Sequence, residues 1–131
     1  MHLTMMTNKL TKNRQMLYDY VDRSQVPIST KAICEQFRDK MDQATVYRGL
    51  TFLENNHYIE GFSFSCFEEG TMKYYFGIKE KHPHFLHCKK CHHFILIDNC
   101  NKKDLKAMAV QQGIQIDYHV HYYIGICKQC L

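Results

Sequence analysis

The chain has 131 residues, a formal net charge of +4, seven cysteines and nine histidines. This length suits one ordinary domain or two small ones. No apolar run approaches the roughly 18 residues that a membrane-spanning helix needs, and no charged-then-apolar leader can be recognised. We therefore expect no membrane segment and no signal peptide, and we expect the protein in the cytoplasm.

Charge is unevenly distributed along the chain. Residues 1–80 contain ten Lys or Arg and ten Asp or Glu, whereas residues 81–131 contain seven and three. The first part is therefore neutral. A nucleic-acid-binding role for it has to rest on a motif rather than on bulk charge.

Three helices are predicted in the first part of the chain. They cover residues 10–24, the segment from a cap at residue 29 or 30 to Met41, and residues 43–56. The apolar positions repeat at helical spacing and predict the buried faces Leu10, Leu17, Tyr20 and Val21; Ile33, Phe37 and Met41; and Val46, Leu50 and Leu53. The predicted N-terminal caps are Thr11, then Ser29 or Thr30 after a turn over 24–30, and Asp42.

Strand signals follow the third helix. Aromatic and β-branched residues cluster over 57–78 on both sides of "EEGT", which predicts a β-hairpin. Three helices and a hairpin are the layout of a winged helix-turn-helix domain. We predict a hinge over 79–83.

The remainder of the chain predicts a small α/β domain. "HFLHC" and "HHFILID" are typical of strands on either side of "CKKC", and a third strand is expected over 114–127. A helix is expected over 100–113, closed by Gly113. The predicted fold class is therefore α+β.

Four cysteines lie in two C-x-x-C pairs, "CKKC" at 88–91 and "CKQC" at 127–130. Each pair allows two thiolates to reach one ion about 2.3 Å away, so the two pairs suit one tetrahedral zinc. A unit of about fifty residues has little hydrophobic core of its own, so a bound metal adds stability to its fold. We predict a structural Zn²⁺ held by Cys88, Cys91, Cys127 and Cys130.

A redox dithiol is the alternative interpretation of either pair, but it needs a thiol at a helix N-terminus in a thioredoxin-like unit, and the sequence does not predict one. Cys34, Cys66 and Cys100 are expected to be small buried hydrophobic residues.

The third predicted helix turns a chemically distinctive face outward. Ala44 allows close approach, the Arg48 guanidinium can bind a guanine edge or a phosphate, and the ring of Tyr47 can lie on a thymine methyl, with Thr51 beside them. An ordinary solvated helix face is the plainer alternative.

Several segments together resemble the ferric-uptake-regulator (Fur) family. "QATVYRGLTFLENNHYI" resembles its recognition helix, with the A-T-V-Y-R signature, and "LTKNRQMLYDYV" resembles its first helix. "HPHFLHCKKC" and "HVHYYIGICKQC" resemble its two metal-binding segments. The resemblance covers nearly the whole chain, in order.

The resemblance implies a homodimeric transcriptional regulator, usually a repressor that binds a double-stranded DNA operator when metal is bound. It implies a winged-helix DNA-binding domain over 1–80 and a dimerisation and metal-binding domain over 81–131. It also implies that Tyr47 and Arg48 contact DNA, that Arg14 and Thr45 support or touch the DNA backbone, and that the paired cysteines hold structural zinc.

The family's usual sensing site takes histidines five and three residues before the first zinc cysteine, where this chain has Pro83 and Phe85. A second family site takes ligands six and four residues before that cysteine, which are His82 and His84 here. The remaining ligands of the second site would be His119 and a carboxylate, for which Asp104 lies one position from register. We predict a regulatory metal at His82, His84, Asp104 and His119.

Imidazole and carboxylate ligands suit Zn²⁺, Fe²⁺ or Mn²⁺, and we favour zinc because the usual iron- and peroxide-sensing ligands are absent. Two alternatives stay open. A one-residue β-bulge would move His82 and His84 into the usual sensing site, with Cys66, Glu68 or Glu69 completing it. Otherwise the histidines are a relic that binds no metal.

The predicted function is metal-responsive transcriptional regulation, as a repressor of metal-homeostasis or stress genes. A regulator with structural zinc only, which binds DNA independently of metal, and a peroxide or thiol redox sensor are the alternatives. We expect no enzyme activity and no small-molecule substrate, because the sequence shows neither a nucleophile–base arrangement nor a phosphate-cradling glycine loop.

Overall fold

The computed structural model describes residues 10–66, 70–78, 84–97, 102–116 and 121–131, without the side chains of Phe64, Cys66, His121 and residues 102–104. The chain divides into two compact units, Met1–Lys79 and Glu80–Leu131, each described below by itself. The predicted hinge over 79–83 and the tip of the predicted hairpin over 67–69 lie outside the described residues.

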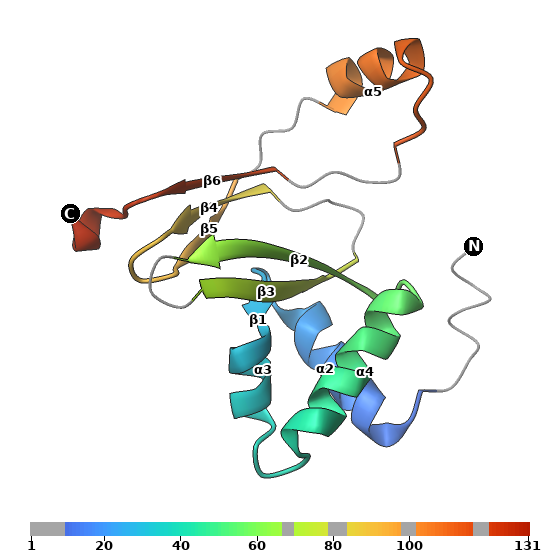
Figure 1. Cartoon of the computed structure of the whole chain (residues 1–131), viewed down its shortest axis with the longest axis vertical. Coiled ribbons are helices and arrows are strands. Elements are labelled where there is room, and N and C mark those ends of the chain that lie inside the picture. The colour runs from blue at the N-terminus through green and yellow to red at the C-terminus, as the bar shows by residue number, and fades with distance from the viewer. Residues whose placement is uncertain (1–9, 67–69, 79–83, 98–101, 117–120) are drawn as a thin grey trace. The chain divides into compact units, whose positions relative to one another are not determined.

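In its described residues, the first unit combines three helices with a three-stranded antiparallel sheet (Figure 1). The helices are α2 (Lys12–Arg23), α3 (Thr30–Gln36) and α4 (Gln43–Asn55). The strands β1 (Ile28–Ser29), β2 (Ile59–Cys66) and β3 (Gly70–Gly77) lie in the order β1-β3-β2. The hairpin predicted over 57–78 is confirmed by the antiparallel pairing of β2 with β3.

Each of the three helices begins at a side-chain cap. The backbone N–H groups of Arg14, Ala32 and Thr45 donate to the side-chain oxygens of Thr11, Ser29 and Asp42 at 3.3, 3.1 and 2.8 Å. These bonds satisfy donors that have no partner within a helix. Thr11 and Asp42 are thus confirmed as caps, and Ser29 rather than Thr30 caps the second helix.

Two local predictions in this unit are wrong. The second helix ends at Gln36, and Met41 lies beyond it in a turn closed by a hydrogen bond from its N–H to the carbonyl of Phe37. Met41 is nevertheless buried, so its apolar character reflects tertiary packing rather than helical register. The segment predicted as a turn over 24–30 contains β1, which pairs with β3 forty-odd residues later in the chain.

The core of the first unit lies between the helices and the sheet. All three predicted apolar faces contribute to it, and Tyr58, Ile59 and Tyr75 supply the sheet side. Fully buried side chains of this size each contribute roughly 1.5–3 kcal/mol relative to exposure. The fully buried residues are Leu17, Val21, Ile33, Val46, Leu50, Leu53 and Ile59.

The second unit is built on the sheet β5-β4-β6. Strand β4 (His84–Cys88) pairs antiparallel with β5 (Phe94–Leu96) and parallel with β6 (His121–Gly125). The parallel pair requires a crossover, which contains α5 (Lys102–Gln111), and a short 3₁₀ helix, η1 (Lys128–Cys130), follows β6.

The predicted strands and helix of this unit are all present, but the third strand begins at His121 rather than at residue 114. The core is small. Phe85 is its one fully buried side chain among the described residues, and it packs between Phe94 and Tyr122 with ring centroids 5.0 and 5.5 Å away. Among the helices that the structure describes, none is long and apolar enough to cross a membrane.

Candidate functional site

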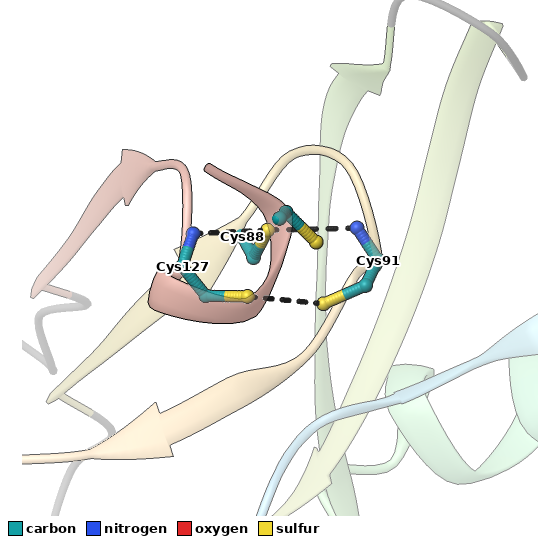
Figure 2. A group of neighbouring side chains, drawn as sticks. Cys88, Cys91 and Cys127 are labelled. Atoms are coloured by element: carbon teal, nitrogen blue, oxygen red, sulfur yellow. Dashed lines mark hydrogen bonds between the residues drawn. The ribbon is translucent and has the colours of Figure 1, made fainter.

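The two cysteine pairs meet at one end of the β4–β6 strand pair. Cys88 closes β4 and aligns with Gly125 of β6, so the chain leaving β6 places Cys127 beside it. The turn after β4 returns Cys91, and η1 supplies Cys130. Figure 2 shows the first three of these side chains converging on a common point.

The geometry of the four sulfurs fits a divalent metal ion. All four Sγ atoms lie within 4.8 Å of one another, and those of Cys91 and Cys127 are 3.7 Å apart. A tetrahedral ion with metal–sulfur bonds of about 2.3 Å requires sulfur–sulfur edges of roughly 3.8 Å. Among the residues that the structure describes, this is the one group of three or more potential ligands that could share an ion.

The backbone around the cluster favours negative charge on sulfur. The N–H groups of Cys91 and Cys127 donate to the Cys88 sulfur at 3.5 and 3.3 Å, and these bonds lower the pKa of the Cys88 thiol to about 5 (Figure 2). Hydrogen bonding to Cys127 instead raises the pKa of Cys130 to about 12. One thiolate thus forms readily, whereas several adjacent thiolates require a cation.

The predicted regulatory site is only partly within the described structure. His84 lies on β4 opposite His121 and is buried, with 5% of its surface exposed. His82 and His119 lie outside the described residues, and the side chain of Asp104 is not described. The structure therefore brings no regulatory ligand set together, and the regulatory site stays a prediction.

His87 on the same strand has a different environment. It is 3% exposed, and the centroid of its ring lies 4.3 Å from the centroid of the Phe94 ring. Burial and the neighbouring His92 lower its pKa to about 4, so it is neutral at physiological pH. Cys34 is half-buried in the first unit, and burial raises the pKa of its thiol.

The outward face of α4 carries the residues predicted to meet DNA. Ala44, Tyr47, Arg48 and Thr51 are all exposed, with Tyr47 at 48%. The opposite face, with Val46, is fully buried. The helix thus presents a small residue, an aromatic ring, a guanidinium and a hydroxyl on one surface.

Arg14 of α2 and Thr45 of α4 each contact a side chain of α4. The guanidinium carbon of Arg14 lies 3.8 Å from the centre of the Phe52 ring, which joins α2 to α4 through a cation–π contact. Thr45 accepts a hydrogen bond from Arg48 at 3.4 Å, so it holds that side chain along the helix. The role of Phe52 was not predicted, because Phe52 lies outside the predicted apolar stripe and nothing beside it in the sequence indicates a partner on another helix.

A family model described as "Ferric uptake regulator family" matches residues 6–123. The chain belongs to the ferric uptake regulator family. Members of this family are DNA-binding transcription regulators, not enzymes. No curated protein sequence matches the chain significantly.

Solved structures share the Fur fold at low sequence identity. The Vibrio cholerae ferric uptake regulator is 22% identical with a TM-score of 0.69, covering 96% of this chain and 97% of its own. The Helicobacter pylori regulator, described as having three functional metal-binding sites, is 20% identical with a TM-score of 0.70, covering 98% and 88%. A zinc uptake regulator complexed with zinc and DNA is 18% identical with a TM-score of 0.59, covering 93% and 83%.

Proposed function

We propose that the protein is a cytoplasmic, metal-responsive repressor that binds a double-stranded DNA operator as a homodimer. The four-sulfur cluster is the single observation that carries this proposal, because four thiols lie within 4.8 Å of one another and the 3.7 Å between the Cys91 and Cys127 sulfurs is close to the edge of a tetrahedral metal site. The first unit would be a winged-helix DNA-binding domain and the second a dimerisation domain. When bound, the ion would hold the segments that follow β4 and β6 together at the C-terminal end of this parallel pair.

The exposed face of α4 supports operator recognition in the major groove. Arg48 would contact a guanine edge or a phosphate, Tyr47 a thymine methyl, and Ala44 and Thr51 would allow close approach. Arg14 and Thr45 would contact the DNA backbone or support the residues that do. Arg14 would give this support through its contact with Phe52, and Thr45 through its hydrogen bond with Arg48. The solved zinc uptake regulator bound to DNA belongs to the same fold, which agrees with this assignment.

Exposed apolar side chains on the second unit support dimerisation through its sheet. Leu86 lies between its cross-strand partners Ile95 and Tyr123, and the three are 40%, 48% and 54% exposed. Contiguous exposed apolar surface of this kind marks an interface. We expect Leu86→Glu to convert a dimer into a monomer in sedimentation equilibrium, whereas Lys40→Glu on the first unit leaves the dimer intact.

Regulation would come from a second divalent ion at His82, His84, Asp104 and His119, with Zn²⁺ favoured over Fe²⁺ or Mn²⁺. Such an ion shifts the protein toward the DNA-binding form only by its difference in affinity between the two forms. If His84→Ala leaves the metal dependence of operator binding unchanged while the first zinc is retained, this assignment is wrong.

Elemental analysis before and after treatment with a moderate chelator tests the metal assignments. We expect one zinc per chain that resists the chelator and a second, exchangeable ion. One resistant zinc with no second ion on metal addition would instead favour a regulator whose DNA binding is independent of metal. Zinc that is absent, or released by mild peroxide with formation of a disulfide, would favour the thiol sensor.

A further inference from the structure

A glutamine opens the exposed face of α4 at its N-terminal end. Gln43 is the first residue of the helix, directly after the cap Asp42, and its side chain is exposed. It lies four residues before Tyr47, so the two side chains are neighbours on one side of the helix. Gln43 therefore extends the surface that is proposed to meet DNA by one helical turn.

The amide of Gln43 is oriented by Tyr47. Its Nε2 donates to the Tyr47 hydroxyl at 3.5 Å, which is long for a hydrogen bond. The helix is capped by Asp42 instead, whose carboxylate accepts from the N–H of Thr45 at 2.8 Å. A glutamine amide has a second N–H and a carbonyl oxygen. Both of these groups can therefore serve a ligand while the first N–H holds the side chain against Tyr47.

Arg48 is held in a comparable way on the same helix. Its guanidinium donates to the hydroxyl of Thr45 at 3.4 Å. The two oriented groups differ in chemistry, because a guanidinium only donates hydrogen bonds whereas an amide both donates and accepts. A pure donor matches the two acceptors on the major-groove edge of guanine, and a donor beside an acceptor matches N7 and N6 of adenine.

We propose that Gln43 reads an adenine in the major groove of the operator, with Tyr47 orienting its amide. The free N–H of the amide would donate to adenine N7, and the amide oxygen would accept from the N6 amino group. The inference rests on the proposed DNA-binding function. It goes further by assigning a base preference to a residue at the N-terminal end of the helix, where recognition helices of this kind contact base edges.

The place of this adenine follows from the spacing of the two side chains. Tyr47 is proposed to contact a thymine methyl, and Gln43 lies one turn away along the helix. One turn spans about 5.4 Å, which is less than two base-pair steps of about 3.4 Å. The adenine would therefore belong to the base pair that contains this thymine or to the pair beside it. The pair Gln43–Tyr47 would thus require A·T sequence next to the base that Arg48 reads.

The test compares the full-length, zinc-loaded protein with Gln43→Ala and Tyr47→Phe. Gln25→Ala is the matched control, because Gln25 is also exposed but lies in the turn between α2 and β1. Fluorescence anisotropy would measure binding to a duplex that the wild type selects from a randomised pool. In further duplexes, 7-deazaadenine would replace single adenines to remove the N7 acceptor, and deoxyuridine would replace single thymines to remove the methyl group. Circular dichroism and thermal melting would check the fold, which Gln43→Ala should retain because alanine favours a helix.

We expect one 7-deazaadenine to weaken binding by the wild type and by Gln25→Ala roughly fivefold or more, as for the loss of a bidentate base contact. The same duplex should not weaken binding by Gln43→Ala, because the contact is already absent. Tyr47→Phe should stay sensitive to deoxyuridine, since its ring remains, but should lose most of its sensitivity to 7-deazaadenine. Full sensitivity of Tyr47→Phe to 7-deazaadenine would overturn the orienting role of Tyr47.

Gln43→Glu gives a second, independent test. A carboxylate cannot donate to N7 but can accept from the N4 amino group of cytosine. We expect selection with Gln43→Glu to change the preferred base at that position from adenine to cytosine. The added charge should weaken binding to every duplex, so the measured quantity is the ratio of affinities for duplexes that differ at this position. A carboxylate in the first turn stabilises a helix, so this variant should also keep α4 folded.

Failure of this inference differs from failure of the proposed function. Suppose that Gln43→Ala selects the same sequence as the wild type, or weakens binding to all duplexes equally, while Arg48→Ala changes the selected sequence. Gln43 then reads no base, but the protein still recognises DNA. If the wild-type protein selects no sequence and binds no duplex with or without added Zn²⁺, both the proposed function and this inference are wrong.

Discussion

The two units of the chain are stabilised in different ways. Among the described residues, seven apolar side chains of the first unit are fully buried between three capped helices and a sheet, whereas Phe85 alone is fully buried in the second. The second unit also leaves Met108 and Val110 of α5 exposed, at 54% and 77%. A unit of its size with so small a core depends on other stabilisation. We propose that a metal ion at the sulfur cluster and contact with a second copy of the chain supply this additional stabilisation.

The largest expected effect comes from removing one cluster ligand. Cys127→Ser should abolish tight zinc binding and unfold the second unit while the first stays folded, because metal binding to such sites supplies about 10 kcal/mol or more of folding free energy. Hydrogen exchange followed by mass spectrometry would report the two units separately. Cys34→Ser, which lies outside the cluster, should retain both zinc and protection. Equal loss of protection in both units would show that zinc stabilises the first unit as much as the second.

In the first unit, we expect stability to depend on the apolar core. Leu50→Ala should lower the free energy of unfolding of that unit by roughly 2–5 kcal/mol, because it leaves a cavity in a fully buried region. Urea unfolding of the zinc-loaded protein would measure it. Val110→Ala in α5 should change stability by less than about 0.5 kcal/mol. A large loss from Val110→Ala would mean that a partner covers α5, which sedimentation of the same sample would reveal.

Gly49 in the first unit and Gly125 in the second differ in how closely their surroundings are packed. A Cβ added at Gly49 of α4 would come within 2.5 Å of Leu17 Cδ1, whereas one added at Gly125 of β6 meets nothing within 4 Å. We expect Gly49→Ala to destabilise by about 1–3 kcal/mol because the interior of the first unit cannot expand. Gly125→Ala should be nearly neutral in the monomeric Leu86→Glu background. Thermal melting of the paired variants would measure both.

The smallest expected effect is a pH dependence of α4. Hydrogen bonds from Thr45 lower the pKa of the Asp42 carboxyl. The stabilisation by this cap is therefore fully present above the ordinary pKa of an unfolded Asp and is lost as the pH falls through the lowered pKa of the folded protein. Asp42→Asn keeps a side-chain oxygen at the cap but does not titrate, so its melting temperature should depend less on pH in that acidic range. Identical pH profiles would rule out this contribution.

Much of the fold could be predicted because its signals are local. Helical spacing and capping residues located α2 and α4, and the cap at Ser29 located the start of α3. Strand β1 and the burial of Met41 could not be found this way, since both depend on contacts with residues far along the chain. The same limit applies to the end of α3, which is set by the turn that follows.

The candidate site shows the same division. The cysteine cluster was predictable, because spacing within each C-x-x-C pair and the count of four thiols already suit one ion. A hollow of about 410 Å³ in the first unit was not predictable, because it joins residues 29–31, Tyr47 and residues 71–73, which share no local pattern. The cation–π contact of Arg14 with Phe52 was missed for the same reason.

The pairing of β4 with β6 gives the cluster one further property. Its ligands come from both sides of the crossover that contains α5, so an ion bound there would close the intervening chain into a loop. Lengthening such a loop is inexpensive, about 0.6 kcal/mol for each doubling, so the crossover can tolerate insertions. A single proteolytic cut between β5 and β6 would leave two pieces that elute together in gel filtration. Those pieces would separate only in denaturant with a chelator strong enough to remove the ion.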